Sequence, residues 1–260
     1  MRPLLMVHGL GGSAHDTFGA PGRFSKKTAA GGMCLFLQQQ GYQPGRDLFW
    51  YTYNSFQPVP ASARRLKKEL ATILTDSGKP GADLLTFSLG GIVSKYFAVS
   101  PLYEGEIRRL IMVAPPFYGS PWANWLRTRF VPGESDYIFP GDGRSLSPQI
   151  LSFKSPFLMK LAQTPFPSGI ETTIIAARAT AGAARDPLSS YARWLTTWLG
   201  EGDSVVPLKS TKIPVDHYYE LAEEFSIRIM HRFLPFHPQI QQLVAQQLRS
   251  GKAGSSSCRS

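Results

Sequence analysis

The sequence of 260 residues is short of cysteine, of acidic residues and of long apolar runs, and each shortage excludes something. Its two cysteines, Cys34 and Cys258, lie in an apolar helix-like segment and in a Ser-rich tail, so we expect no structural disulfide. No run approaches the ~20 apolar residues of a membrane-spanning helix. A hydrophobic content of 43% is nevertheless ample for a globular core.

Basic residues outnumber acidic ones by 28 to 18, which gives a formal net charge of +10. The basic residues are scattered, apart from Arg64, Arg65, Lys67 and Lys68 on one helix-like segment. We interpret this as a solvated surface rather than a nucleic-acid site, while transient contact with an anionic lipid surface stays open. A strand-like run begins two residues after Met1, so no signal peptide is visible and a cytoplasmic location is the default. Secretion is not excluded.

Strand-like and helix-like segments alternate through the first half of the chain. Continuous apolar or aromatic runs at 3–7, 47–53, 82–87, 109–114 and 172–177 predict buried strands, and helical periodicity at 28–40, 61–75 and 239–249 predicts helices. This alternation indicates an α/β fold with a mostly parallel central sheet of about six strands flanked by helices.

The strand at 82–87 runs directly into Ser88-Leu89-Gly90-Gly91 and then a helix-like stretch. A sharp strand-to-helix turn exposes a serine hydroxyl and places the next backbone N–H at a helix N-terminus, which suits a nucleophile. The usual pattern is Gly-x-Ser-x-Gly, and Thr86 departs from it at the first glycine. The alternative is that Ser88 only caps a helix.

A second Gly-rich turn, His8-Gly9-Leu10-Gly11-Gly12, follows the first strand. Such a loop either cradles phosphate or presents N–H groups to a carbonyl oxygen. It lacks both the Gly-x-Gly-x-x-Gly spacing and the Lys-Ser/Thr end of phosphate loops. The loop is therefore expected to present N–H groups to a carbonyl oxygen, and we expect His8 to shape the loop rather than to carry a proton.

Late in the chain, Asp203 lies in a Gly-rich turn before Val205-Val206-Pro207, with Glu201 as a competing acid. His231 follows the alternating run 225–229, which predicts an edge strand, and it precedes the last helix. Alternatively, residues 221–234 form one helix, and His217 is then the base. His237 is expected beside a helix cap, and His15 in a loop, where it is structural or lines the pocket.

Two segments interrupt the alternation. Residues 117–169 are rich in Pro, Ser and aromatics, and residues 179–200 form a second excursion; we interpret both as lid or cap insertions in a single domain of residues 1–249. An irregular packing loop is the alternative for the first of them. The Gly/Ser/Lys-rich tail, 250–260, is expected to be disordered.

Five motifs occur in register: the loop after the first strand, Phe-Ser-Leu-Gly-Gly, Ala-Pro-Pro-Phe-Tyr-Gly-Ser-Pro, Gly-Asp-Ser-Val-Val-Pro and His-Arg-Phe-Leu. With these the chain resembles a bacterial lipase or esterase of the α/β-hydrolase superfamily, close to the small-core triacylglycerol lipases. The chain order Ser88, Asp203, His231 is the order of that superfamily.

The resemblance implies a serine hydrolase that cleaves carboxylic esters through an acyl-enzyme. Ser88 is then the nucleophile, His231 the base and Asp203 its orienting acid, while the Leu10 and Leu89 N–H groups bind the oxyanion. No metal, organic cofactor or obligate protein partner is expected; the substrate is a small-molecule or lipid ester. Acyl transfer, thioester hydrolysis and a non-catalytic binding role on the same fold are the alternatives.

Overall fold

A computed structural model describes residues 1–21, 29–121, 123, 151, 154–180, 201–224, 226 and 229–250. The elements in chain order are β1 (Leu4–Val7), α1 (Ala14–Phe18), α2 (Met33–Gln39), β2 (Leu48–Tyr51), α3 (Val59–Ser77), β3 (Ala82–Phe87), α4 (Leu89–Val99), β4 (Ile107–Val113), α8 (Pro156–Gln163), β5 (Glu171–Thr180), α10 (Leu208–Thr211), β6 (His217–Glu224), the 3₁₀-helix η2 (His231–Phe236) and α11 (Pro238–Ser250).

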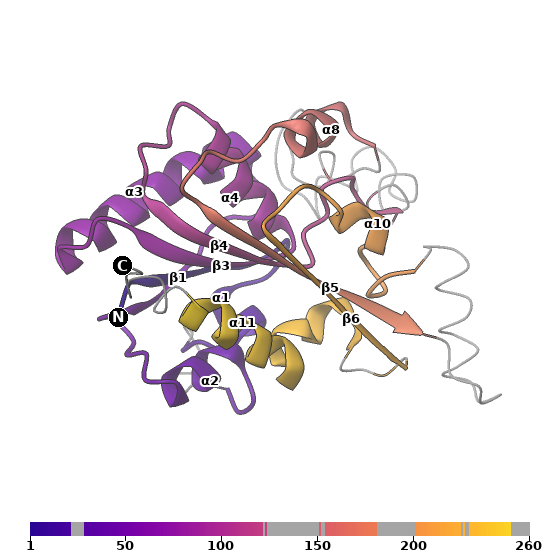
Figure 1. The fold of residues 1–260 in the computed structure, drawn as a ribbon, viewed down its shortest axis with the longest axis horizontal. Coiled ribbons are helices and arrows are strands. Elements are labelled where there is room, and N and C mark those ends of the chain that lie inside the picture. Colours follow the sequence, from indigo (N-terminus) through magenta and orange to yellow (C-terminus); the bar gives the residue numbers. More distant parts are fainter. Residues whose placement is uncertain are drawn as a thin grey trace, which may run out of the picture.

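These strands form one sheet in the order β2-β1-β3-β4-β5-β6, and every described pairing is parallel. Helices α3, α4, α8 and α10 cover one face, and α1, α2, η2 and α11 cover the other (Figure 1). The predicted architecture of a parallel sheet of six strands flanked by helices is confirmed.

Burial on both faces explains why the central strands are continuous apolar runs. In β1, Leu5 and Val7 pack under α3 and α4, whereas Leu4 and Met6 pack under α2 and α11. All four side chains are fully buried. Because successive strand residues point to opposite faces, a sheet with helices on both sides needs apolar residues at every position.

The last strand differs from the prediction. β6 spans His217–Glu224 and pairs with β5 from Thr173 to Thr180, so the edge strand of the sheet begins earlier than predicted and 221–234 is not one helix. Residues 225, 227 and 228 of the predicted strand lie outside the described residues. An edge strand buries little, and in β6 only Leu221 is buried, so the strand carries no apolar alternation. Ile229 is fully buried in the hydrophobic core on the side of the sheet that α11 covers.

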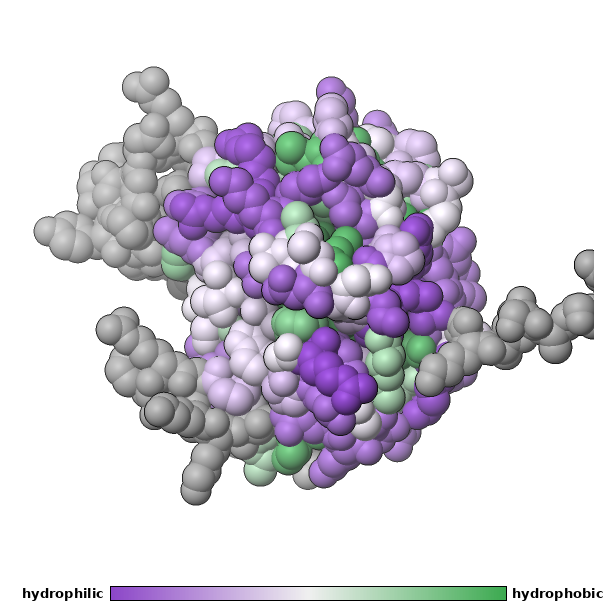
Figure 2. Space-filling model, turned by 90° about the vertical axis from the view of Figure 1, so that its left-hand side faces the viewer, coloured by the Kyte–Doolittle hydropathy of each residue, from purple (hydrophilic) through white to green (hydrophobic). Residues whose placement is uncertain are grey.

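The face at the amino ends of the strands is mostly hydrophilic (Figure 2). Beneath it, Arg109 is buried and contacts the carboxylates of Asp83 and Glu171 at 3.6 and 2.7 Å. No described helix is long and apolar enough to cross a membrane. The main parts of the predicted lids, 124–150 and 181–200, and the tail beyond Ser250 lie outside the described residues, whereas 179–180 continue β5.

Candidate active site

Ser88 stands at the sharp turn between β3 and α4. Its backbone has φ 53° and ψ −122°, a region that residues with a side chain rarely adopt. Its N–H donates to the Val113 carbonyl oxygen at 2.9 Å, which holds the turn over the carboxyl end of the sheet. Such strain persists where the surrounding structure imposes it, and it is typical of functional turns.

Two glycines let α4 pass close to its neighbours. A Cβ on Gly90 would lie 2.4 Å from the Val7 carbonyl oxygen, and one on Gly91 would lie 2.9 Å from Pro115. Thr86 is accommodated because its hydroxyl reaches the Ile111 carbonyl at 3.4 Å, and the missing side chain of Gly91 leaves room beside it. The departure at Thr86 therefore leaves the turn intact.

His8 holds the Gly-rich loop, as expected. Its Nδ1 donates to the Gly9 carbonyl at 2.8 Å, its Nε2 accepts from the Tyr53 N–H at 3.3 Å, and its ring stacks on that of Tyr53. Burial lowers the pKa of His8, which keeps the ring neutral for these two roles. The Gly11 N–H donates to Ser55 Oγ at 2.9 Å, which fixes the far side of the loop.

The loop then passes directly beside Ser88. A Cβ on Gly9 would lie 3.0 Å from the Cβ of Ser88, so the Leu10 N–H follows immediately after this close approach. Leu89 is the first residue of α4, and a first-turn N–H has no acceptor inside its own helix. Both amides are thus carried by the two segments that meet at the serine.

Asp203 and His231 form a buried pair at the same edge of the sheet. His231 Nδ1 and Asp203 Oδ2 are 2.6 Å apart, and the two residues are 8% and 1% exposed. The other oxygen, Oδ1, accepts the N–H groups of Val205 and Val206 at 3.1 and 2.8 Å. The His231 N–H also donates to the Asp203 carbonyl at 2.8 Å, so the backbone fixes the pairing as well.

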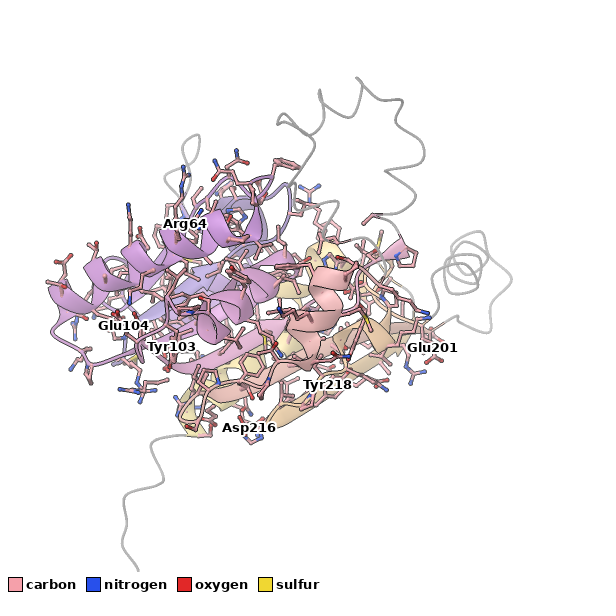
Figure 3. The ribbon with its side chains drawn as sticks, turned by 90° about the horizontal axis from the view of Figure 1, so that it is seen from above. Arg64, Tyr103, Glu104, Glu201, Asp216 and Tyr218 are labelled. Carbon is pink, nitrogen blue, oxygen red and sulfur yellow. The ribbon has the colours of Figure 1, made fainter. Side chains whose placement is uncertain are left out.

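The structure places the competing residues elsewhere. His217 begins β6 and contacts Glu171 Oε1 at 3.5 Å, at the amino ends of the strands and away from Ser88. Glu201 is exposed, and its carboxylate forms an ion pair at 3.3 Å with Arg178, near the carboxyl end of β5 (Figure 3). The ring nitrogens of His15 and His237 contact the Ala20 carbonyl and Glu223, respectively, and His237 ends η2 next to α11, as expected.

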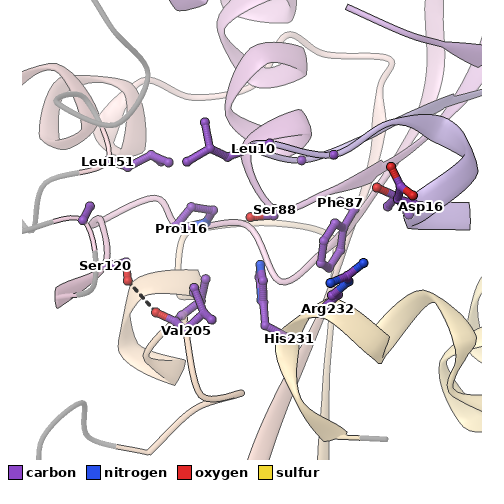
Figure 4. A pocket seen from close by; sticks show the side chains of 16 residues that line it. Leu10, Asp16, Phe87, Ser88, Pro116, Ser120, Leu151, Val205, His231 and Arg232 are labelled. Carbon is purple, nitrogen blue, oxygen red and sulfur yellow. Dashed lines mark hydrogen bonds between the residues drawn. The ribbon is translucent and has the colours of Figure 1, made fainter. Parts of the chain in front are cut away.

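Ser88 and His231 line one cavity of 390 Å³, and the imidazole rises toward the serine hydroxyl (Figure 4). The ring of His231 also packs on Phe87, with centroids 4.7 Å apart. Most of the remaining wall is apolar or glycine, as in Leu10, Pro116, Ala123, Leu151, Val205 and Val206. Among the described residues, no three His, Cys, Asp or Glu side chains converge as a metal site.

Three residues near the site carried no assigned role in the sequence. Ser120 Oγ donates to the carbonyl oxygen of Val205 at 2.5 Å, in the loop that carries Asp203. Asp16 and Arg232 line the cavity. Ser120 and Arg232 lie inside two of the five motifs, Ala-Pro-Pro-Phe-Tyr-Gly-Ser-Pro and His-Arg-Phe-Leu, and that position is the signal that could have singled them out.

The model of the Alpha/beta hydrolase family matches residues 4–239. The chain belongs to this family. The family that the five motifs predicted is thereby confirmed. A comparison with curated protein sequences finds no significant match.

Solved structures share the fold at low sequence identity. The mature lipase BlEst2 of Bacillus licheniformis is 19% identical, with a TM-score of 0.67, over 95% of this chain and 91% of that one. Phospholipase PlaB of Legionella pneumophila is 16% identical, with a TM-score of 0.65, over 95% of this chain and 59% of that one. The metagenomic carboxyl esterase MGS0156 is 15% identical, with a TM-score of 0.63, over 96% and 76%.

Proposed function

We propose that the chain is a serine hydrolase that cleaves carboxylic esters through an acyl-enzyme. The observation that carries the proposal is that His231, which is hydrogen-bonded to Asp203, lines the same cavity as Ser88. Lipases and esterases among the structural neighbours are consistent with this activity. The apolar wall around Leu10 and Leu151 suits the acyl part of the ester.

In the acylation step, Ser88 Oγ attacks the ester carbonyl carbon while His231 takes the hydroxyl proton. The N–H groups of Leu10 and Leu89 would stabilise the oxyanion, because both lie on the segments that meet at the serine. The carbon–oxygen bond then breaks, and His231 returns the proton to the leaving alcohol. Asp203 holds the imidazole in the tautomer with its proton on Nδ1 and stabilises the imidazolium.

Deacylation repeats the sequence with water in place of the serine. His231 takes one proton from the water, the hydroxide adds to the acyl carbon, and the proton returns to Ser88 as the carboxylic acid leaves. Net consumption is one ester and one water, and the products are one acid and one alcohol. No residue outside the cavity is needed for proton transfer.

The nucleophile is tested with a fluorophosphonate probe and a series of chromogenic esters of increasing acyl length. Wild type should be labelled and Ser88→Ala should not. Turnover should depend on acyl length because the wall is apolar. Equal labelling of Ser88→Ala would disprove the assignment of the nucleophile, and no turnover at any length would contradict ester hydrolysis.

The base is tested with a matched pair of histidine variants. His231→Ala should lose turnover by a factor of about 10⁴ or more, because a triad works as a unit. His217→Ala serves as the control, since that side chain lies at the amino ends of the strands, whereas Ser88 follows the carboxyl end of β3. Loss of turnover in His217→Ala alone, with the fold intact by circular dichroism, would reverse the assignment.

A further inference from the structure

The rim of the cavity beside Ser88 carries one acidic and one basic side chain that the proposed chemistry does not use. Apart from His231, Asp16 and Arg232 are the titratable residues among those that line it. Both side chains are exposed. Within the described part of the chain, neither takes part in an ion pair, and Asp16 Oδ2 accepts a hydrogen bond from Ser13 Oγ at 2.7 Å. The cavity rim therefore carries one positive and one negative charge that do not neutralise each other by contact.

The two charges lie at one end of the cavity. Figure 4 shows Asp16 and Arg232 on the Phe87 side of Ser88, whereas Leu10 and Leu151 lie on the other side. The cavity thus has a charged end and an apolar end, with the serine between them.

The charged end is the one that the leaving alcohol should occupy. His231 must deliver its proton to the leaving oxygen, so the alcohol faces the imidazole. Arg232 is the next residue in the chain, and the ring of Phe87 packs on His231 at 4.7 Å. The acyl chain then extends toward Leu10 and Leu151, where no charge lies in the described wall.

We propose that Asp16 and Arg232 form a headgroup subsite for an ester whose alcohol part is zwitterionic. The guanidinium of Arg232 suits a phosphate, which it can bind through two parallel hydrogen bonds, and Asp16 suits an ammonium group. The substrate class is a monoacyl phospholipid, such as lysophosphatidylcholine. This assignment rests on the proposed ester hydrolysis, in which water splits the acyl ester into a fatty acid and a glycerophosphodiester.

The test compares two esters with the same short acyl chain, a lysophosphatidylcholine and a monoacylglycerol, at concentrations below micelle formation. Wild type should prefer the phospholipid in kcat/KM. The preference should fall about tenfold in both Arg232→Gln and Asp16→Asn, because each loses one charge contact with the headgroup. Asp16→Asn keeps an oxygen that can accept from Ser13 Oγ.

Arg64→Gln is the matched control. Arg64 is exposed on the outer side of α3, so this substitution removes one positive charge, as Arg232→Gln does, but far from the cavity (Figure 3). It should keep the wild-type preference. Dissociation constants of both lipids for Ser88→Ala, measured by calorimetry, repeat the comparison without turnover. They should show the same preference, and the preference should weaken at high salt.

Three results would overturn the subsite. These are no preference in wild type, an unchanged preference in both cavity variants, or an equal loss in Arg64→Gln. A loss in only one cavity variant would disprove the zwitterionic assignment in favour of a singly charged headgroup. Each of these outcomes leaves ester hydrolysis standing if the monoacylglycerol is still cleaved. Selective lipid binding without cleavage of any ester would support the subsite and disprove the proposed function.

Discussion

The hydroxyl of Ser120 donates a hydrogen bond of 2.5 Å to the carbonyl oxygen of Val205, across 85 positions of the sequence. The N–H of the same Val205 donates to Asp203 Oδ1 at 3.1 Å. Ser120 thus holds the loop whose amides fix the proposed catalytic acid. It acts through another residue, so it is a positioning residue.

Ser120→Ala should therefore lower kcat by about three- to tenfold with little change in KM, because a misplaced acid no longer orients His231. Ser210→Ala is the control. Ser210 Oγ donates to the Gly119 carbonyl at 2.6 Å and accepts from the Tyr118 N–H at 3.0 Å, so its hydroxyl braces the same segment through described hydrogen bonds that do not involve Asp203 or Val205. It should lower the melting temperature but change kcat little. Steady-state kinetics with a chromogenic ester measure the difference, and equal losses of kcat in the two variants would contradict it.

A second prediction concerns the strain at Ser88. Glycine adopts φ 53° and ψ −122° without strain, whereas alanine is strained there. The free energy of unfolding of Ser88→Gly should therefore exceed that of Ser88→Ala by about 1–2 kcal/mol, although both variants lose the proposed nucleophile. Urea unfolding of the pair isolates the backbone effect, because both lack the hydroxyl. Equal stability would mean that the strain relieved at this turn is no larger than the entropy that glycine adds to the unfolded chain.

The departure at Thr86 leads to a third prediction. Thr86→Gly restores the usual glycine pattern, yet it should lower the free energy of unfolding by about 1–2 kcal/mol. It deletes a fully buried side chain and its hydrogen bond to Ile111, and it adds chain entropy to the unfolded state. Turnover should not increase, because the turn at Ser88 is already formed. Thermal melts and ester kinetics test both parts; a gain in kcat would mean that Thr86 distorts the site.

The sequence predicted the strands that carry apolar or aromatic runs, including β2 at one edge of the sheet, and it missed β6 at the other edge for a physical reason. β1 is apolar at all four positions because helices cover both of its faces, so its pattern reports its surroundings. β6 lies at the sheet edge and buries only Leu221, so nothing in its pattern distinguishes it from a loop. Of the run at 225–229 the structure describes residues 226 and 229, and Ile229 is buried in the hydrophobic core on the side of the sheet that α11 covers.

The candidate site shows the same division. Ser88, Asp203 and His231 stand in local motifs whose glycines, prolines and chain order mark them. The contact of Ser120 with Val205 depends on how two distant loops meet, and no local pattern encodes it. The sequence favoured His231 as the base and left His217 as the alternative, because which end of the strands each histidine reaches depends on the tertiary structure.

Lys95 of α4 has an environment unusual for a lysine. It is 1% exposed, and its ammonium lies 4.3 and 5.3 Å from the ring centroids of Phe166 and Phe117. Its described hydrogen-bond acceptor is the Ala162 carbonyl of α8, at 3.5 Å. Desolvation by burial lowers the pKa of Lys95 from 10.5 to about 8.

This pKa predicts a specific dependence of stability on pH. Between about pH 8 and 10.5 the unfolded chain holds a proton at Lys95 that the native state has released, so the free energy of unfolding rises with pH. The stability of wild type relative to Lys95→Met should therefore increase across this window, by about 2–3 kcal/mol at most, since the two aromatic rings favour the charged form. Lys68→Met, which changes an exposed lysine of α3, is the control and should run parallel to wild type. Urea unfolding at a series of pH values gives both differences. A constant gap between wild type and Lys95→Met would show that the buried amine keeps its proton throughout.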